Sequence, residues 1–173
     1  MLSKDAAPET SPHLSFQLAD EEYAVPVSRV REIIEYDTVT RVPSTPAWIR
    51  GVINLRGGVV PVVDLGLRLG LPERAVTKRS CMVILELTLD GAPALVGVTV
   101  DAVSQVEEIR AQDVEAVPAF GTRLRVDCLL GMARHGKKFV LLLDIDRVLA
   151  DDALLSAAAQ PEPPSEAAAE AAS

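Results

Sequence analysis

Short runs of apolar, mainly branched residues alternate with polar turn signals along most of the chain. Gly, Asp or Pro separates the runs, and they recur about every ten residues, a pattern typical of small all-β barrels or sandwiches. In chain order the runs are LSFQLA, YAVPV, VTRV, GVINL, VVPVVDL, CMVILELTL, ALVGVTV, LLGMAR and FVLLLDI. The pattern predicts an all-β fold built from hairpins.

Four short segments between these runs contain the residues that tight hairpin turns need. Three of the four contain glycine, which adopts the positive φ of such turns without steric cost. The segments are ADEE (19–22), Gly57–Gly58, Asp90–Gly91 and HGK (135–137). Each of them predicts a β-hairpin.

Helical signals are few and short. The best is SRVREIIE (28–35), where Ser28 is a suitable cap and Val30, Ile33 and Ile34 share one helical face. Two further candidates, DLGLRLG and DIDRVLADD, each begin with an aspartate, which favours a helix N-terminus. The sequence therefore predicts three short helices beside the strands.

One stretch occurs twice in related form. GVINLRGGVVPVVDL begins at Gly51, and a weaker echo, GMARHGKKFVLLLDI, begins at Gly131, so that Asp64 and Asp144 occupy matching positions 80 residues apart. In both copies a glycine opens a strand, a polar turn follows, and an apolar run ends in the aspartate. We interpret both aspartates as strand-to-helix caps, which explains them better than a role as catalytic acids.

Two further pairs of segments match in the same order. YAVPVSRV (23–30) resembles LVGVTVDAV (95–103), and VTRVP (39–43) resembles VEAVP (114–118). Short apolar motifs match easily by chance, but a fixed order of three matches favours a duplicated architecture. The chain is therefore predicted to contain two units of similar construction.

The folded region is expected to cover residues 13–150, with a first half at about 13–70 and a second half at about 80–150. Which strands the two halves exchange is left open by the sequence. Residues 1–12 are polar, and residues 151–173 form an Ala/Pro/Glu/Ser tail of low complexity. Such compositions predict disorder in both terminal segments.

Composition narrows the classes of partner. The 173 residues are 49% hydrophobic and carry a formal net charge of −8, with a pI near 4.8 and only 3% aromatic residues. Nucleic-acid binding needs clustered positive charge, and single strands need stacking platforms, so we expect no nucleic-acid partner. No apolar run approaches the roughly 20 residues that span a bilayer, and the N-terminus lacks a secretory signal, so a cytoplasmic protein is expected.

The sequence offers little for catalysis or metal binding. Cys81 and Cys128 lie among apolar neighbours and are interpreted as small buried hydrophobes, while His13 and His135 are isolated. These four residues fit no zinc spacing. GVINLRGG lacks the Lys-Ser/Thr of a phosphate-binding loop and continues into a strand. We expect no enzyme activity, no cofactor and no metal.

From His13 to about Ala150 the chain resembles the chemotaxis coupling proteins, the CheW-like domain family. The signature pieces are FQLADEEYAVPVSRVREII, VTRVPSTPAWIRGVINLRGGVVPVVDL, GVTVDAVSQV and LLLDIDRVL. The resemblance implies two SH3-like five-stranded β-barrels packed side by side, with short helices. It also implies a non-enzymatic adaptor between the cytoplasmic tip of a methyl-accepting chemoreceptor and the regulatory domain of a chemotaxis histidine kinase.

On this resemblance the protein would be cytoplasmic and recruited to membrane-associated receptor arrays, without direct membrane insertion. A scaffold of the same family in a receptor-kinase pathway that controls surface motility or gene expression is the alternative. The resemblance places receptor contact at matching positions of this sequence, namely Val30, Glu32, Gly51, Arg56, Val103 and Val106. It places kinase contact at Val39 and Arg41.

Each of these residues also has a purely structural interpretation. The three valines of the receptor set suit core packing, Gly51 suits a close backbone approach, and residues 39 and 41 suit an exposed turn. Arg56 is either a solvated turn residue or donates both ends of its guanidinium to the carboxylate of Glu32, and such a pair would shape the mouth of a groove. Trp48 is expected to plug a barrel edge.

Overall fold

The computed structural model describes residues 10–89, 91–117 and 128–150, and the described chain is built mainly from strands. The strands are β1 Thr10–Leu18, β2 Glu21–Pro26, β3 Val30–Glu35, β4 Ile49–Leu55, β5 Gly58–Asp64, β6 Cys81–Leu89, β7 Ala92–Val100, β8 Ala102–Arg110, β9 Val114–Glu115, β10 Leu129–His135 and β11 Lys138–Leu143. The helical turns are η2 Val27–Arg29, α1 Leu65–Arg68, η3 Ala111–Asp113 and α2 Ile145–Val148. The prediction of an all-β fold is confirmed.

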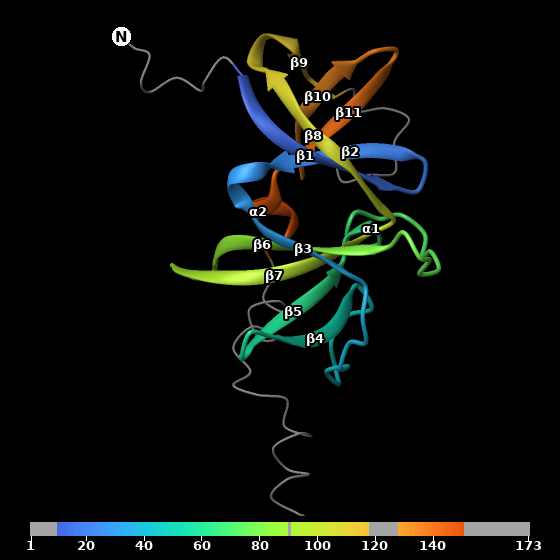
Figure 1. The fold of residues 1–173 in the computed structure, drawn as a ribbon, viewed down its shortest axis with the longest axis vertical. Helices are drawn as coiled ribbons and strands as arrows, with labels where there is room; N and C mark the ends of the chain where they lie inside the picture. The colour runs from blue at the N-terminus through green and yellow to red at the C-terminus, as the bar shows by residue number, and fades with distance from the viewer. Residues whose placement is uncertain (1–9, 90, 118–127, 151–173) are drawn as a thin grey trace, which may run out of the picture.

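The described strands form two sheets. One, barrel A, has the order β8-β1-β2-β11-β10-β9, and the other, barrel B, has the order β3-β6-β7-β5-β4. Figure 1 shows barrel A at one end of the molecule and barrel B at the other. They are the two SH3-like subdomains that the resemblance implies, although the short β9 gives barrel A a sixth strand where barrel B has only a bridge between Thr40 and Val52.

The two barrels repeat one design with strands drawn from both halves of the chain. The order of barrel B becomes that of barrel A when β3, β6, β7, β5 and β4 are replaced by β8, β1, β2, β11 and β10. Even the single parallel contact in each sheet is repeated, because Val62 faces Gly97 in barrel B and Leu142 faces Ala24 in barrel A. The predicted duplication is thus visible in the pairing of the strands.

Both copies of the strand-turn-strand repeat end in the same way. The side chain of Asp64 accepts a hydrogen bond from the backbone N–H of Leu67 and opens α1, and the side chain of Asp144 accepts one from Arg147 and opens α2. The predicted caps and one-turn helices are therefore confirmed. The four predicted hairpins are present as well, linking β1 to β2, β4 to β5, β6 to β7 and β10 to β11.

A central core lies between the barrels and takes side chains from both. Its fully buried members include Phe16 and Tyr23 of barrel A, whose rings stack with centroids 6.4 Å apart, and Val83 and Leu85 of barrel B. Leu69 and Leu149, which follow the two short helices, complete it. Burying these side chains stabilises both barrels together, because each fully buried aliphatic or aromatic group contributes about 1.5–3 kcal/mol.

Each barrel also has a smaller core on the other face of its sheet. In barrel B it contains Val62, Met82 and Ile84, the neighbours of residues that face the central core. In barrel A the corresponding cluster is Ala24, Ile109, Ala133, Val140 and Leu142. Because successive side chains of a strand point to opposite faces, each strand contributes to both cores. This explains why the apolar runs are nearly continuous.

The helix predicted over 28–35 is wrong. The chain makes only the single 3₁₀ turn η2 and then continues as β3. A β-bulge separates Val30 from Glu32, so Val30 packs on the central core while Ile34 packs on the core of barrel B. The half-buried positions of β3 alternate with exposed ones, so Ile33 is exposed and does not share a buried face with Val30 and Ile34. The helical spacing of these three apolar residues therefore did not reflect the positions that are buried.

The boundaries of the folded region also differ in detail from the expected ones. Strand β1 begins at Thr10, three residues before the expected start at His13. The remaining residues predicted to be disordered, 1–9 and 151–173, lie outside the described residues. Within the described part of the chain, no helix has the length and apolarity to cross a bilayer.

The buried hydroxyl of Tyr23 lowers the stability of the fold. Its hydroxyl is buried without a hydrogen-bond partner among the described residues, and burial together with nearby Glu21 raises the pKa of Tyr23 to about 12. Replacing Tyr23 with Phe removes the unsatisfied hydroxyl and keeps the stacked ring. We expect the free energy of unfolding to rise by about 1 kcal/mol in chemical denaturation, and a fall of that size would contradict this account.

Candidate functional site

The residues predicted to touch the receptor lie mainly on two equivalent strands. Val30 and Glu32 belong to β3, at the edge of barrel B, and Val103 and Val106 belong to β8, at the edge of barrel A. A bulge follows Val30 in β3, and an equivalent irregularity sits beside Val103 in β8. The two strands therefore present matching surfaces from the two barrels.

The valines on these strands divide into two kinds. Val30 and Val103 are partly buried against the same central core, so the core-packing interpretation holds for both. Val106 is 59% exposed, and its equivalent on β3, Ile33, is 42% exposed. Exposed apolar residues at equivalent places on two edge strands are candidates for partner contacts, because such groups gain most from being covered.

Glu32 and Arg56 form an ion pair, which is one of the two alternatives that were left open for Arg56. Arg56 lies in the turn between β4 and β5, and its Nη2 donates to Oε1 of Glu32 at 2.6 Å. Since β3 and β4 are the two edge strands of the sheet in barrel B, the pair joins these edges and helps to close the barrel. Hydrogen bonding to Arg56 lowers the pKa of Glu32, and the same bond raises the pKa of Arg56.

This pairing has a measurable titration signature. Because the pKa of Glu32 is lowered, the pair is intact above the ordinary value of 4.5 and is lost only as the pH falls through the lowered pKa. An NMR titration should give a midpoint below 4.5 for Glu32 in the parent protein and a return towards 4.5 in Arg56→Ala. Identical midpoints in the two proteins would show that the pair does not form in solution.

Gly51 acts through its lack of a side chain. Its φ is +145°, and a Cβ placed on it would lie 2.0 Å from the carbonyl oxygen of Thr40. Thr40 pairs with Val52 beside it through two backbone hydrogen bonds of 2.7 and 2.9 Å. The close-approach interpretation of Gly51 is therefore correct, and the glycine lets the segment after β3 lie directly on β4.

The two residues predicted to touch the kinase, Val39 and Arg41, flank Thr40 at its contact with Gly51. Val39 is partly buried against the core of barrel B, and Arg41 is exposed. The structure places them on either side of Thr40, along the outer edge of β4. Trp48 is partly buried against the central core, with the guanidinium of Arg68 4.5 Å from the centre of its ring.

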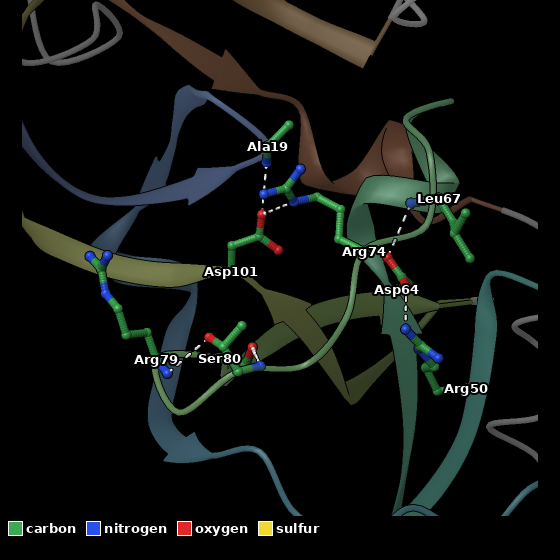
Figure 2. A network of polar contacts seen from close by, with 9 residues as sticks. Ala19, Arg50, Asp64, Leu67, Arg74, Arg79, Ser80 and Asp101 are labelled. Carbon is green, nitrogen blue, oxygen red and sulfur yellow. Dashed lines mark hydrogen bonds and ion pairs between the residues drawn. The ribbon is translucent and has the colours of Figure 1, made fainter.

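A polar network at the junction of the barrels was not predicted from the sequence. Asp64 accepts from Arg50 at 2.7 Å as well as capping α1 (Figure 2). Asp101, between β7 and β8, accepts from the backbone N–H of Ala19 and from Nε of Arg74, both at 2.8 Å (Figure 2). A cavity of about 20 Å³ among these groups has room for roughly one water molecule.

The aspartates that end the two repeated segments, Asp64 and Asp144, have structural roles. Both are used as helix caps, and Cys81 and Cys128 pack with the central core, the first partly buried and the second fully buried. No group of His, Cys, Asp and Glu residues in the described ranges is arranged to hold a metal ion. The acids and bases that gather at the junction are paired with one another, which suits a role in holding segments together.

Comparisons with known proteins agree with one another. The CheW-like domain model matches residues 12–153. The Chemotaxis protein CheW of Klebsiella aerogenes is 33% identical over 139 residues, covering 80% of this chain and 81% of that protein, and the Bacillus subtilis protein of the same name is 32% identical over 143 residues, covering 82% and 88%. The crystal structure of scaffolding protein TtCheW from Thermoanaerobacter tengcongensis superposes with a TM-score of 0.74 at 29% identity, covering 88% of this chain and 96% of that one.

Proposed function

The chain belongs to the CheW-like domain family and is a chemotaxis adaptor that couples receptors to a kinase, and we propose that it does so purely by binding. In this proposal it catalyses no reaction. One surface holds the cytoplasmic tip of a methyl-accepting receptor, and another holds the regulatory domain of the histidine kinase. A shift in the receptor then biases kinase activity through a coupling free energy of about 1–3 kcal/mol.

The observation that carries the proposal is the pair of equivalent edge strands beside one shared core. Strands β3 and β8 come from different barrels, and Val30 and Val103 rest against the same central cluster. A rigid body of this kind holds two partners in a fixed relation. It offers exposed apolar anchors, Ile33 and Val106, of the type that an amphipathic helix covers.

We assign receptor contact to the surface that contains Val30, Glu32, Gly51, Arg56, Val103 and Val106. Within this set, Val106 supplies an exposed anchor, the Glu32–Arg56 pair supplies a polar rim, and Gly51 lets the segment that contains Thr40 lie against β4. We assign kinase contact to Val39 and Arg41, which lie at the outer edge of barrel B.

The same comparisons support the pathway in this proposal. Curated relatives from several bacterial groups carry the name Chemotaxis protein CheW, which favours chemotaxis over control of surface motility or gene expression. In this proposal the protein works in the cytoplasm and is recruited to membrane-associated receptor arrays through its partners.

The receptor assignment predicts a selective loss of binding. Val106→Glu places a charge in the centre of the proposed contact, and we expect the dissociation constant for a receptor-tip fragment to rise at least tenfold, since desolvating an unpaired charge costs several kcal/mol. Calorimetry with the isolated kinase regulatory domain should show unchanged affinity. Ser104→Glu is the matched control, because Ser104 is exposed on the same strand.

The Glu32–Arg56 pair gives a second arm of this test. Reversing both charges in Glu32→Arg/Arg56→Glu keeps the pair, whereas either single change breaks it. We expect each single variant to weaken receptor binding and the double variant to recover most of it. A double variant that binds no better than the single ones would count against a role for the pair in shaping the receptor surface.

A further inference from the structure

The chain passes between the barrels at two equivalent crossings. At the first, η2 leads from β2 of barrel A to β3 of barrel B. At the second, Asp101 leads from β7 of barrel B to β8 of barrel A. An arginine–aspartate ion pair lies at each crossing, and we call them the first latch, Arg29–Asp146, and the second latch, Arg74–Asp101.

The first latch ties three segments together. Arg29 in η2 donates from Nη1 and Nη2 to the two carboxylate oxygens of Asp146 in α2, at 3.2 and 2.6 Å. Its Nε donates to the backbone carbonyl of Glu86 in β6, at 2.9 Å. Because α2 follows β11 of barrel A and β6 belongs to barrel B, a single guanidinium joins the crossing to both barrels.

The second latch has the same plan with the charges exchanged. Here the crossing carries the acid, and Oδ2 of Asp101 accepts from Nε of Arg74 in the segment after α1 of barrel B (Figure 2). The same oxygen accepts from Ala19 in the β1–β2 turn of barrel A, and the N–H of Asp101 donates to the carbonyl of Gln17 at 2.9 Å. Both barrels are again held at one residue.

Each latch lies directly before the edge strand that carries the proposed receptor residues. Arg29 precedes Val30, the first residue of β3, and Asp101 precedes Ala102, the first residue of β8. The latches therefore fix where each edge strand leaves the junction. Strands β3 and β8 belong to different barrels, so the distance between their surfaces depends on how the two barrels are placed relative to each other.

We propose that Arg29 and Asp101 are positioning residues, which set the mutual orientation of the two barrels and thereby the geometry of the receptor surface. This inference rests on the proposed function, and it assigns to the latches no contact with the receptor. Partly exposed ion pairs contribute little to global stability. Breaking one latch should therefore leave the protein folded while it changes the relation between the barrels.

The partner residues Asp146 and Arg74 are the best places to test this, since they lie outside the proposed receptor surface. We expect Asp146→Arg and Arg74→Asp each to raise the dissociation constant for a receptor-tip fragment at least tenfold, with little change in melting temperature or in affinity for the kinase regulatory domain. The swapped pairs Arg29→Asp/Asp146→Arg and Arg74→Asp/Asp101→Arg should recover part of the lost affinity, because each restores the ion pair but not the hydrogen bond to the backbone of Glu86 or Ala19. Arg134→Ala is the control, because it removes a surface ion pair with Glu115 away from both crossings.

A direct measure of geometry separates this inference from the proposed function. Spin labels at Thr38 in barrel B and Lys137 in barrel A, with Cys81 replaced by Ala, report the distance between the barrels by pulsed electron resonance. We expect the distance distribution to broaden or shift in Asp146→Arg and to recover in the swapped pair. An unchanged distribution, or receptor affinity that falls only in step with melting temperature, would overturn the inference. A parent protein that fails to bind the receptor fragment would overturn the proposed function instead.

Discussion

Replacing Gly51 with alanine should lower the free energy of unfolding by about 3 kcal/mol or more. The new Cβ would lie 2.0 Å from the carbonyl oxygen of Thr40, and the obstacle is backbone that cannot rotate away. The φ of +145° adds strain for any residue with a side chain. Urea denaturation followed by fluorescence of Trp48 measures the loss, and receptor binding should fall with it.

Two other glycines provide the controls for this result. A Cβ at Gly57 meets nothing within 4 Å, so Gly57→Ala tests positive φ without a clash and should cost much less. A Cβ at Gly131, the equivalent of Gly51 in barrel A, lies 2.6 Å from Cγ1 of Val114 and 2.8 Å from the carbonyl oxygen of Glu115. We expect an intermediate loss there. Equal losses at Gly51 and Gly57 would show that the contact with Thr40 is not tight in solution.

Truncating Phe16 to alanine should destabilise the protein by about 3–5 kcal/mol, the range for removing a buried aromatic ring. Phe16 is fully buried in the central core and stacks on Tyr23. Because that core holds side chains from both sheets, its loss should loosen both barrels at once. For a chain of this size the melting temperature should fall by roughly 6–20 °C.

Hydrogen exchange can show whether the two barrels respond together. In Phe16→Ala, amide protection should decrease in β6 of barrel B as well as in β2 of barrel A, although Phe16 belongs to β1. Ile33→Ala is the control, because Ile33 is an exposed apolar residue and its truncation should change stability by less than about 0.5 kcal/mol. Protection that is lost in barrel A alone would contradict a shared core.

Local sequence signals predicted the hairpins and caps well, since each depends on residues close together in the chain. The turn at Gly57 and the capping aspartates Asp64 and Asp144 are examples. The duplication could also be predicted, because equivalent pieces kept their order. The exchange of strands between the barrels could not, since nothing local states which distant strand will be the neighbour of β1 or β6.

The two edge strands show why pattern reasoning failed where it did. The first, β3, was predicted as a helix, and the equivalent strand β8 was not predicted at all. Both carry an irregular register near the crossing, after Val30 and beside Val103. In β8 the exposed residues 104–106 follow one another, and in β3 the apolar Ile33 falls on an exposed position, so the apolar residues of neither strand alternate along the sequence. A bulge moves the next side chain to the other face of the sheet, and a period-2 search does not find such a strand.

Of the ion pairs discussed above, one was expected from the sequence and another was missed. The Glu32–Arg56 pair was predicted because the resemblance supplied both residues, and the structure brings their side chains within 2.6 Å. The pair Arg29–Asp146 was missed, because its members are 117 residues apart and become neighbours only when α2 packs against the first crossing. Basic residues next to a predicted turn, followed much later by an acid on a short helix, are too common to single out without coordinates.

We infer that the two barrels together hold a receptor and a kinase at the same time without catalysing a reaction. Analytical ultracentrifugation of the purified protein with a receptor-tip fragment and the kinase regulatory domain can show whether all three bind together. We expect a ternary complex that forms without nucleotide. Changes at Val106 should weaken only the receptor complex, and changes at Val39 or Arg41 should weaken only the kinase complex. If the two partners compete for the protein, or if neither binds, this inference is wrong.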